Sequence, residues 1–349
     1  MGNNTMMKQY LADRQRHILR FLVEEYVDTG RAVGSQTLID RYPLNVSSAT
    51  VRNEMATLER MGYIQHPHTS SGRVPTDLGY RYYVEHFAQS STLPQNDQIM
   101  IRHQFRQVES QLESWLQLTA SVLAEIAGNV SMVTSPHTAL ARLRHFELLS
   151  LQDRVALLIL VTQESSINQA MIHFSAPVSQ SELSSAADRL NGQLRDLTVP
   201  EVGRTVLTLT GIDQAIGRQV AQTLAAAESG ERSAVHHQGI EYLVQQPEFS
   251  NSEELRPLLD LLRGGSILSV LLPQLAENSD VQIFIGSENV ADELRGFGIV
   301  VASYGVGNQV TGLVGILGPR RMQYERSISS VRYMSQLVSD LMRDLYYRA

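Results

Sequence analysis

Residues 46–75 read VSSATVRNEMATLERMGYIQHPHTSSGRVP, an amphipathic segment followed by a polar loop that glycine and proline interrupt. Val51, Met55 and Leu58 recur at three- and four-residue spacing, which predicts one buried helix face. Gly62 predicts the end of this helix, and residues 63–65 have the composition of a strand. The loop that follows is typical of the tip and return of a short β-hairpin, or wing.

Two further helices are predicted before this stretch. Residues 13–28 have apolar side chains at helical spacing and charged side chains on the other face. Residues 36–41 form a short second helix with Ser35 as its cap, and Pro43 breaks the chain before the third helix. Two helices joined by a short turn, then a third helix and a wing, indicate a winged helix-turn-helix in residues 1–90.

The outward face of the third helix has the composition that a major groove accepts. Small residues permit close approach, and Arg and Asn can each make two hydrogen bonds to one base edge. An ordinary solvated helix face would look similar, but the preceding helix and turn favour DNA binding. One of the two serines at the start of the helix is its predicted N-cap. The residues predicted to contact DNA are Ser35, Ser47, Ser48, Thr50, Arg52, Asn53, Thr57, Arg60, His68, Gly72 and Arg73.

The wing contributes three of these predictions. Gly72 would let the backbone approach DNA closely, so that Arg73 could lie along the minor groove or a phosphate. His66 and His68 have neither a cysteine nor an acidic cluster beside them. We therefore expect them to face phosphate or solvent rather than a metal ion.

Charge permits DNA binding without requiring it. Residues 1–90 carry ten basic and nine acidic residues, a net charge of +1, and the remainder carries 19 against 27, or −8. The chain has no cysteine, no secretory signal and no apolar run long enough to cross a membrane, so we expect a soluble cytoplasmic protein. No catalytic constellation is present, and we predict no enzyme activity, no cofactor and no metal.

The remainder predicts a multidomain α+β protein. A polar linker at 88–97 leads to a long helix at 98–130, and residues 177–233 are mostly helical with a loop at 229–239. A helix is also expected at 253–263, and a last one at 324–346. The predicted strands are 145–151, 155–162, 168–174, 281–285, 299–304 and 311–317. This order indicates one α+β domain, 98–175 and 246–349, interrupted by a mostly helical domain at 176–245.

Three features could suggest other chemistry. The glycines between 305 and 318 lack the order of a phosphate-binding loop, and a strand–turn–strand hairpin explains them. His236 and His237 have no ligand partner at metal-binding spacing, so a surface loop is the better interpretation. Arg320 and Arg321 could bind an anion, but pairing with acidic neighbours is the simpler expectation.

Several segments resemble one protein family. VGSQTL (33–38), VSSATVRNEM (46–55) and PHTSSGRVPTDLGYR (67–81) are similar to the helix-turn-helix and wing of the heat-inducible transcription repressor HrcA family, and IFIGSEN (283–289) and GILGPRRMQY (315–324) resemble its carboxy-terminal part. The resemblance implies a GAF-like domain with an inserted dimerisation domain. It also implies a homodimer that binds the inverted-repeat CIRCE operator of chaperone operons, with activity favoured by the GroEL chaperonin.

Two residues depart from the family pattern. Pro43 stands where the family often has glycine, and Leu78 replaces a usual lysine, which removes one expected phosphate contact. Losing one such contact changes the log–log salt slope of binding by about 0.9. The main alternative function is a winged-helix regulator gated by a small molecule in the GAF-like domain. An enzyme with an accessory DNA-binding domain is a third, weaker one.

Overall fold

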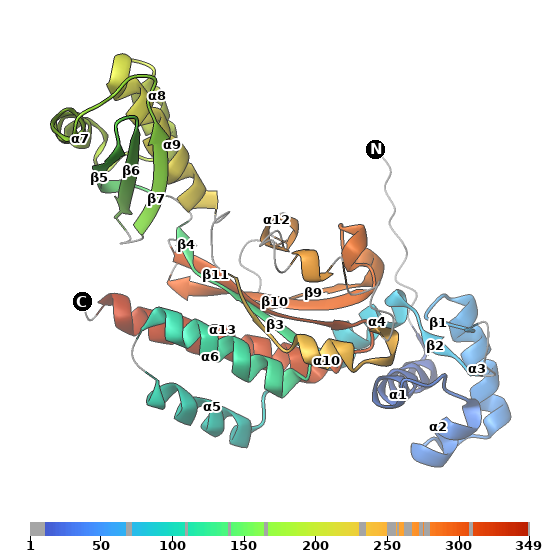
Figure 1. Cartoon of the computed structure of the whole chain (residues 1–349). Helices are drawn as coiled ribbons and strands as arrows, with labels where there is room; N and C mark the ends of the chain where they lie inside the picture. Colours follow the sequence, from blue (N-terminus) through green and yellow to red (C-terminus); the bar gives the residue numbers. More distant parts are fainter. Residues whose placement is uncertain are drawn as a thin grey trace.

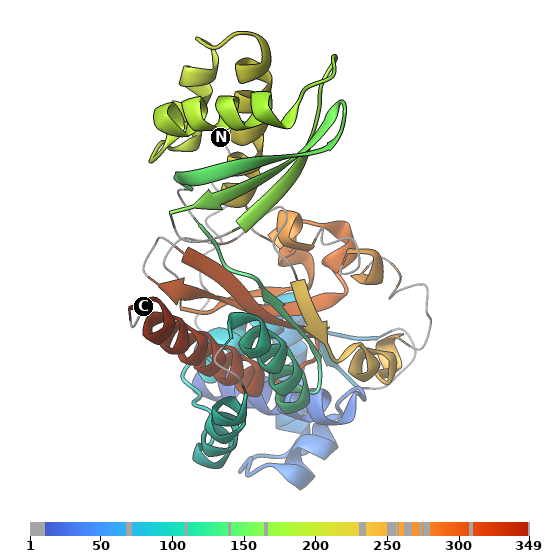
Figure 2. The same ribbon diagram turned by 60° about the vertical axis from the view of Figure 1, so that its left-hand side comes forward.

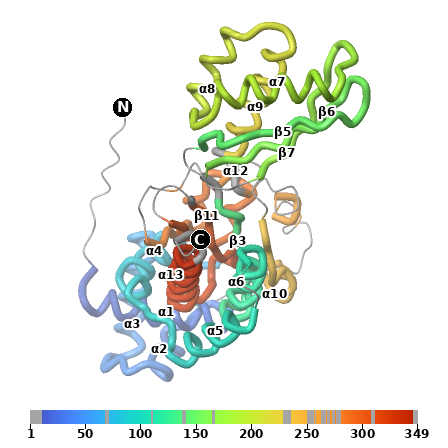
Figure 3. Tube along the Cα trace, turned by 90° about the vertical axis from the view of Figure 1, so that its left-hand side faces the viewer, coloured from blue at the N-terminus to red at the C-terminus, as the bar shows by residue number. Residues whose placement is uncertain are grey.

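The computed structural model describes residues 11–67, 72–108, 111–138, 141–163, 167–229, 235–249, 256, 258–261, 267–271, 275, 280–306 and 310–347. The chain folds into three parts, which we call the head (11–88), the core (the central sheet and the helices on it) and the insert (141–229). The head and the insert lie at opposite ends of the core (Figures 1 and 3). Within the described residues, no helix combines the length and apolar character needed to cross a membrane.

The head is the predicted winged helix-turn-helix. Ser47 Oγ accepts a hydrogen bond from Thr50 N at 3.2 Å and so caps the third helix. Gly62 follows that helix with a φ of +81°, which favours glycine. The elements are α1 (Asp13–Thr29), α2 (Ser35–Arg41), α3 (Ser48–Arg60), β1 (Ile64–Gln65), β2 (Val74–Pro75), α4 (Asp77–Tyr83) and the π-helical turn η1 (Val84–Ala88).

One predicted cap in the head is wrong. Ser35 is the first residue of α2 and not its cap, because the N-cap position is occupied by Gly34. The Ser35 hydroxyl instead lies 3.1 Å from the Ser48 hydroxyl at the start of α3. This contact ties the beginnings of the two helices together.

The core is an antiparallel sheet with strand order β8-β3-β11-β10-β9, and β4 pairs with β11. Helices α6 and α13 cover one face of the sheet, and α10 and α12 lie on the other (Figure 2). The predicted hairpin around the 305–318 glycines is confirmed as β10 and β11. The strands are β3 (Val130–Thr134), β4 (His137–Thr138), β8 (Val235–Gln238), β9 (Gln282–Ile285), β10 (Phe297–Val306) and β11 (Val310–Pro319).

The core helices correct the predicted long helix at 98–130. Two helices occupy this region, because Val108 is extended and Gly128 ends the second helix in a left-handed conformation. Residues 130–134 are all buried and form β3 in the middle of the sheet. The helices and helical turns of the core are α5 (Gln95–Gln107), α6 (Leu112–Ala127), α10 (Ile240–Val244), η2 (Pro247–Phe249), α12 (Ile267–Leu271), η4 (Gly286–Glu288), η5 (Asp292–Leu294) and α13 (Tyr324–Tyr347).

The insert differs from the predicted boundaries of 176–245. Its three strands were expected to belong with the core sheet, but within the described residues they pair only with one another. Alternate side chains of these strands, such as Phe146, Leu158 and Ile172, are buried with the insert's helices in a separate apolar cluster. The elements are β5 (Leu143–Gln152), β6 (Val155–Thr162), β7 (Ile167–His173), α7 (Gln180–Leu194), α8 (Val199–Val206) and α9 (Gly211–Ser229).

The segment after the insert also differs from its prediction as a loop. Residues 235–238 form β8, which pairs with β3 at the edge of the core sheet. His236 and His237 therefore lie on a strand and not in a surface loop. The helix predicted at 253–263 lies largely outside the described residues, although 256 and 258–261 are helical.

Head and core share one apolar interior. Tyr80 of α4 packs against Tyr324 of α13 with ring centroids 6.0 Å apart, and Val84 and Ile328 belong to the same buried cluster. Around this contact Arg320 pairs with Asp77 of the head, and Arg321 pairs with Glu248. The expectation that these two arginines pair with acidic residues is confirmed.

Gly79 gives a test of how α4 is seated on the wing. A Cβ atom at this position would overlap the Tyr63 carbonyl oxygen, which already accepts a hydrogen bond from Thr76 N at 3.0 Å. We expect Gly79→Ala to lower the free energy of unfolding by about 1–3 kcal/mol, because α4 must shift away from β1. Calorimetric unfolding of the full chain measures this change.

Gly192→Ala is the matched control. Gly192 lies inside α7, and no atom stands within 4 Å of where its Cβ would be. Alanine there should raise the free energy of unfolding by about 0.5–1 kcal/mol, since it restricts the unfolded chain. Equal effects of the two substitutions would contradict the steric explanation for Gly79.

Candidate DNA-binding interface

Helix α3 is held in the head by its inner face. Val51 and Leu58 are fully buried and Met55 is nearly so, as the sequence pattern predicts. On the adjacent side, Glu54 accepts a hydrogen bond from the Gln15 side chain of α1 at 3.0 Å. These contacts fix the rotation of α3 about its own axis and leave one side of it in solvent.

Arg52 and Asn53 lie on that solvent side, which we call the recognition face. Both residues are exposed, and in the described part of the chain neither side chain makes a hydrogen bond or an ion pair. Both are therefore available to a ligand, and both have the bidentate geometry that base edges require. The structure brings together the two residues that the sequence predicts for base recognition.

Four hydroxyl groups gather where α2 and α3 begin. Ser35 and Ser48 are 3.1 Å apart, and Ser47 and Thr50 are 2.9 Å apart, in each case between side-chain oxygens. The Ser35–Ser48 contact places the starts of the two helices side by side, and the first backbone N–H groups of a helix attract phosphate. The arrangement suits contacts to the DNA backbone on one side of the recognition face.

The last two predicted residues of α3 interact with each other. Arg60 Nη2 donates to Thr57 Oγ1 at 3.0 Å, and that hydroxyl donates to the Asn53 carbonyl oxygen at 3.2 Å. Arg60 is exposed. Since a guanidinium has five N–H donors, Arg60 keeps most of its donors free for a phosphate.

The wing residues have structural partners that the sequence did not indicate. A Cβ on Gly72 would lie 2.6 Å from the Ala32 carbonyl carbon, so its close approach is to the chain's own backbone. Arg73 pairs with Glu59 at 2.9 Å, contacts His66, and has only 18% of its side chain exposed. A DNA contact by Arg73 would have to compete with Glu59. His68 lies outside the described residues.

A second basic surface, which the sequence interpretation missed, flanks α3. A hollow of about 490 Å³ is lined by Arg14, His17 and Arg20 of α1 and by the turn at 43–46 that precedes α3. The signal was present as three basic or imidazole side chains spaced three apart on one helix face. Arg14 pairs with Glu54 at 3.7 Å and Arg20 with Glu24 at 2.7 Å, so a phosphate beside the start of α3 would compete with these two carboxylates.

The described residues contain no group of three or more His, Asp or Glu side chains that could hold a metal ion. Among the described histidines, His145 lies 2.7 Å from Glu147 Oε1 and His236 of β8 lies 3.5 Å from Glu113 Oε1, in each case through Nε2. One carboxylate and one imidazole fall short of the ligand sets that proteins use for zinc.

Comparison with known proteins gives matches over nearly the whole chain. Residues 10–86 match the family model for the winged helix-turn-helix transcription repressor, HrcA DNA-binding, and residues 113–328 match the HrcA protein C terminal domain. The heat-inducible transcription repressor HrcA of Thermomicrobium roseum is 46% identical over 339 residues, covering 97% of each chain. That of Roseiflexus castenholzii is 40% identical and covers 96% of each. A crystal structure of a protein described as hypothetical is similar at 25% identity, with a TM-score of 0.57 over 95% of this chain and 97% of that one.

Arg52 and Asn53 give the sharpest test of the recognition face. We expect Arg52→Ala or Asn53→Ala to weaken binding to the cognate sequence by about 1–3 kcal/mol, because each removes a two-bond contact to a base. Binding to random DNA should change much less. Titration of both DNAs at fixed salt separates the two effects.

Arg154→Ala is the control for lost charge. Arg154 is exposed and lies between β5 and β6 of the insert, which Figure 1 shows at the end of the core away from the head. Its replacement by alanine removes the same single positive charge. It should leave both affinities unchanged. Equal weakening on cognate and random DNA by Arg52→Ala would assign that residue to a phosphate instead of a base.

Proposed function

Because the chain belongs to the HrcA family of heat-inducible transcription repressors, we propose that it represses chaperone operons by binding their inverted-repeat CIRCE operator as a homodimer. The observation that carries this proposal is the recognition face, where Arg52 and Asn53 project from α3 without partners in the described part of the chain. One head reads one half-site. An inverted repeat therefore calls for two heads related by a two-fold axis.

The insert offers a surface for the second copy. Figure 2 shows α7, α8 and α9 on one side of the β5–β6–β7 sheet. The opposite face presents apolar side chains that follow the pairing of the strands, with Leu149 opposite Leu157 and Leu157 opposite Met171. Ile167 is 68% exposed and Met171 is 50% exposed.

Such a face is unusual for a monomer, because exposed apolar patches of this kind mark interaction surfaces. A second copy is the occupant that the inverted repeat requires, and the same face on both copies would give a two-fold interface. We therefore assign dimerisation to the outer face of the insert sheet. The insert then lies at the end of the core opposite the head, so the heads are the free ends of the dimer.

We further propose that a GroEL-type chaperonin favours the DNA-binding form of the protein in the cytoplasm. Depletion of free chaperonin during heat stress would then release the operons. This part of the proposal comes from the family resemblance, and the full-length match to heat-inducible repressors supports it.

Met171→Glu tests the dimer surface. A carboxylate on the outer face of the insert sheet would have to be buried without a partner in the dimer, which costs several kcal/mol. We expect the variant to sediment as a monomer and to lose most of its operator affinity, while each head stays folded. Analytical ultracentrifugation and operator titration measure the two effects.

Leu207→Glu is the matched control for that substitution. Leu207 is 81% exposed and also lies on the insert, but at the end of α8 and away from the sheet face. It should remain a dimer with full operator affinity. A dimeric Met171→Glu variant would rule out this face as the interface.

Temperature and chaperonin test the mode of regulation. We expect footprints of the protein on an inverted repeat upstream of a chaperone operon to weaken on heating and to be restored by purified chaperonin, because the chaperonin favours the binding-competent population. DNA with one half-site scrambled is the control. Absence of any protected inverted repeat would remove the operator assignment, and insensitivity to both variables would remove heat control alone.

A further inference from the structure

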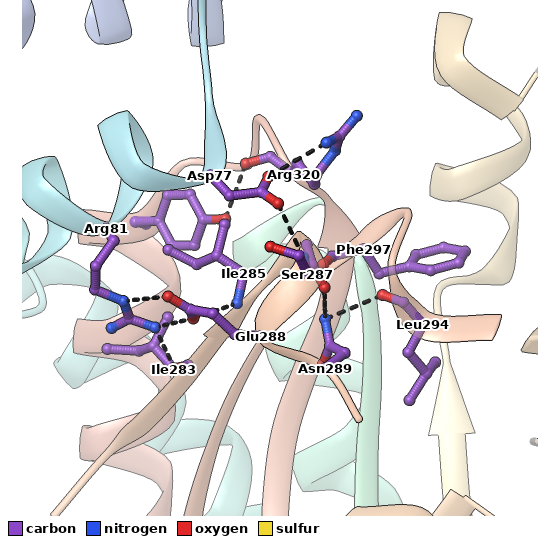
Figure 4. A network of polar contacts seen from close by, with 12 residues as sticks. Asp77, Arg81, Ile283, Ile285, Ser287, Glu288, Asn289, Leu294, Phe297 and Arg320 are labelled. Carbon is purple, nitrogen blue, oxygen red and sulfur yellow. Dashed lines mark hydrogen bonds and ion pairs between the residues drawn. The ribbon is translucent and has the colours of Figure 1, made fainter. Parts of the chain in front are cut away.

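Four charged side chains cross the junction between head and core. Asp77 and Arg81 lie one helical turn apart on α4 of the head, and Glu288 and Arg320 belong to the core. We call these four residues the latch, and Figure 4 shows how they face one another. Each acidic residue pairs with a basic residue of the opposite part.

The first half of the latch is built around Asp77. Its Oδ2 accepts a hydrogen bond from the backbone N of Ser287 at 2.9 Å, and its Oδ1 accepts one from Arg320 Nη1 at 3.2 Å. Gly286 has a φ of +54°, and any Cβ there would overlap the Asp77 carboxylate. The core turn is therefore shaped to receive a carboxylate of the head.

The second half is a two-bond ion pair. Arg81 Nε donates to Glu288 Oε1 at 2.7 Å, and its Nη2 donates both to Glu288 Oε2 and to the Ile283 carbonyl oxygen. Glu288 Oε2 also accepts from Ile285 N at 2.8 Å. The exposed fractions of the two side chains are 24% and 32%, so solvent screens the pair only in part.

The latch and the recognition face lie on opposite sides of the head. Helix α4 packs beside β9 of the core, whereas α3 is on the far side of the head from the core (Figure 1). DNA on α3 would not touch the latch. The latch can influence DNA binding only through the direction in which it holds the head.

Two kinds of contact join head and core: one holds the two parts together, and the other sets the angle between them. The apolar contact of Tyr80 and Val84 with Tyr324 holds the parts together, but burial of apolar surface has little directional preference. A bidentate arginine–carboxylate pair has a fixed geometry. Arg81 makes such a pair with Glu288, and one turn earlier Asp77 accepts from both Arg320 Nη1 and Ser287 N, so two polar contacts on one helix fix the angle of α4 against the core.

We infer that Asp77, Arg81, Glu288 and Arg320 are positioning residues that set the angle of the recognition helix and thereby the half-site spacing that the dimer accepts. This inference rests on the proposed function, since spacing has meaning only for two heads on one operator. A dimer with fixed heads binds half-sites at one separation and one rotational phase. Loose heads would accept several.

The test combines Arg81→Glu with Arg320→Glu, which places like charges across both halves of the latch. The apolar contact beneath remains, and circular dichroism of the full chain checks that the variant is folded. The matched control combines Arg295→Glu with Arg343→Glu. It changes the net charge by the same amount and reverses the charge of two exposed side chains. The partners of these arginines, Asp292 and Asp340, lie three residues away within the core.

The first readout is the head-to-core distance. The chain has no cysteine, so Asp40→Cys in the head and Glu293→Cys in the core, both exposed, introduce two unique sites for spin labels. In dimers diluted with an excess of unlabelled chain, so that only distances within one chain are measured, pulsed electron resonance should give one narrow distance for the chain with the native latch and for the control. We expect a broad distribution for the latch variant.

The second readout is the dependence of operator affinity on the spacing of the two half-sites. Lengthening the operator spacer by about 5 base pairs turns one half-site by half a helical turn. We expect this change to weaken wild-type and control binding by about tenfold or more, and the latch variant by much less. Binding to DNA with a single half-site should be equal for all three proteins.

A narrow head-to-core distance distribution in the latch variant would overturn the inference. A latch variant with a broad distance distribution but the wild-type preference for operator spacing would overturn it as well. If the wild-type chain bound no operator, the proposed function would fail and the spacing role with it, whereas the distance measurement would still decide whether these residues fix the angle. The milder pair Asp77→Asn and Glu288→Gln, which keeps the shapes of the side chains, should give an intermediate distribution.

Discussion

Burial of α4 and its π-helical extension against α13 is the contact on which the arrangement of the molecule depends. Tyr80 and Tyr83 of the head and Tyr324 and Ile328 of the core belong to one apolar cluster, so the head has no separate interior on this side. Tyr80 is only 3% exposed, and this burial raises the pKa of its hydroxyl well above its ordinary value. The Tyr83 hydroxyl is satisfied across the junction by Glu325 at 3.1 Å. This contact joins the DNA-binding head to the core, and the charged pairs around it set the angle between the two.

The elements that the sequence predicted best are those whose signals are local. Helices α1 to α3 follow from side chains three and four residues apart, from the Ser47 cap and from Gly62, all within about one turn of the residue they affect. The errors have non-local causes. Strand β3 has partners near residues 235 and 315, so its five buried residues were joined to the preceding helix. Strands β5 to β7 had a correct pattern but were assigned to the wrong sheet, because alternation shows that one face is buried and not what buries it.

In the candidate site, too, the residues with local signals could be predicted from the sequence and those with distant partners could not. The exposure of Arg52 and Asn53 follows from helix periodicity once Val51 and Leu58 are placed inside. Arg73 could not be assigned by that means. Its partner Glu59 is 14 residues away and meets it only because β2 returns beside β1, the strand that follows α3. Gly72 likewise accommodates the backbone of Ala32, a contact between two loops that no spacing in the sequence encodes. The sequence suggested that Gly72 and Arg73 contact DNA, whereas in the structure they contact Ala32 and Glu59 of the head itself.

The small charge of the head explains why geometry has to contribute to specificity. Residues 1–90 sum to +1 and the remainder to −8, so long-range attraction to DNA is weak and non-specific sites gain little. Binding must then come from the few contacts that α3 and the surfaces beside it can make, and in the proposed dimer these contacts would be made on two half-sites at once. A second half-site adds affinity only when both heads can reach their sites without strain. Each degree of freedom between head and core would reduce that gain, and the paired charges around Asp77 and Arg81 remove such freedom without placing any additional positive charge near the DNA.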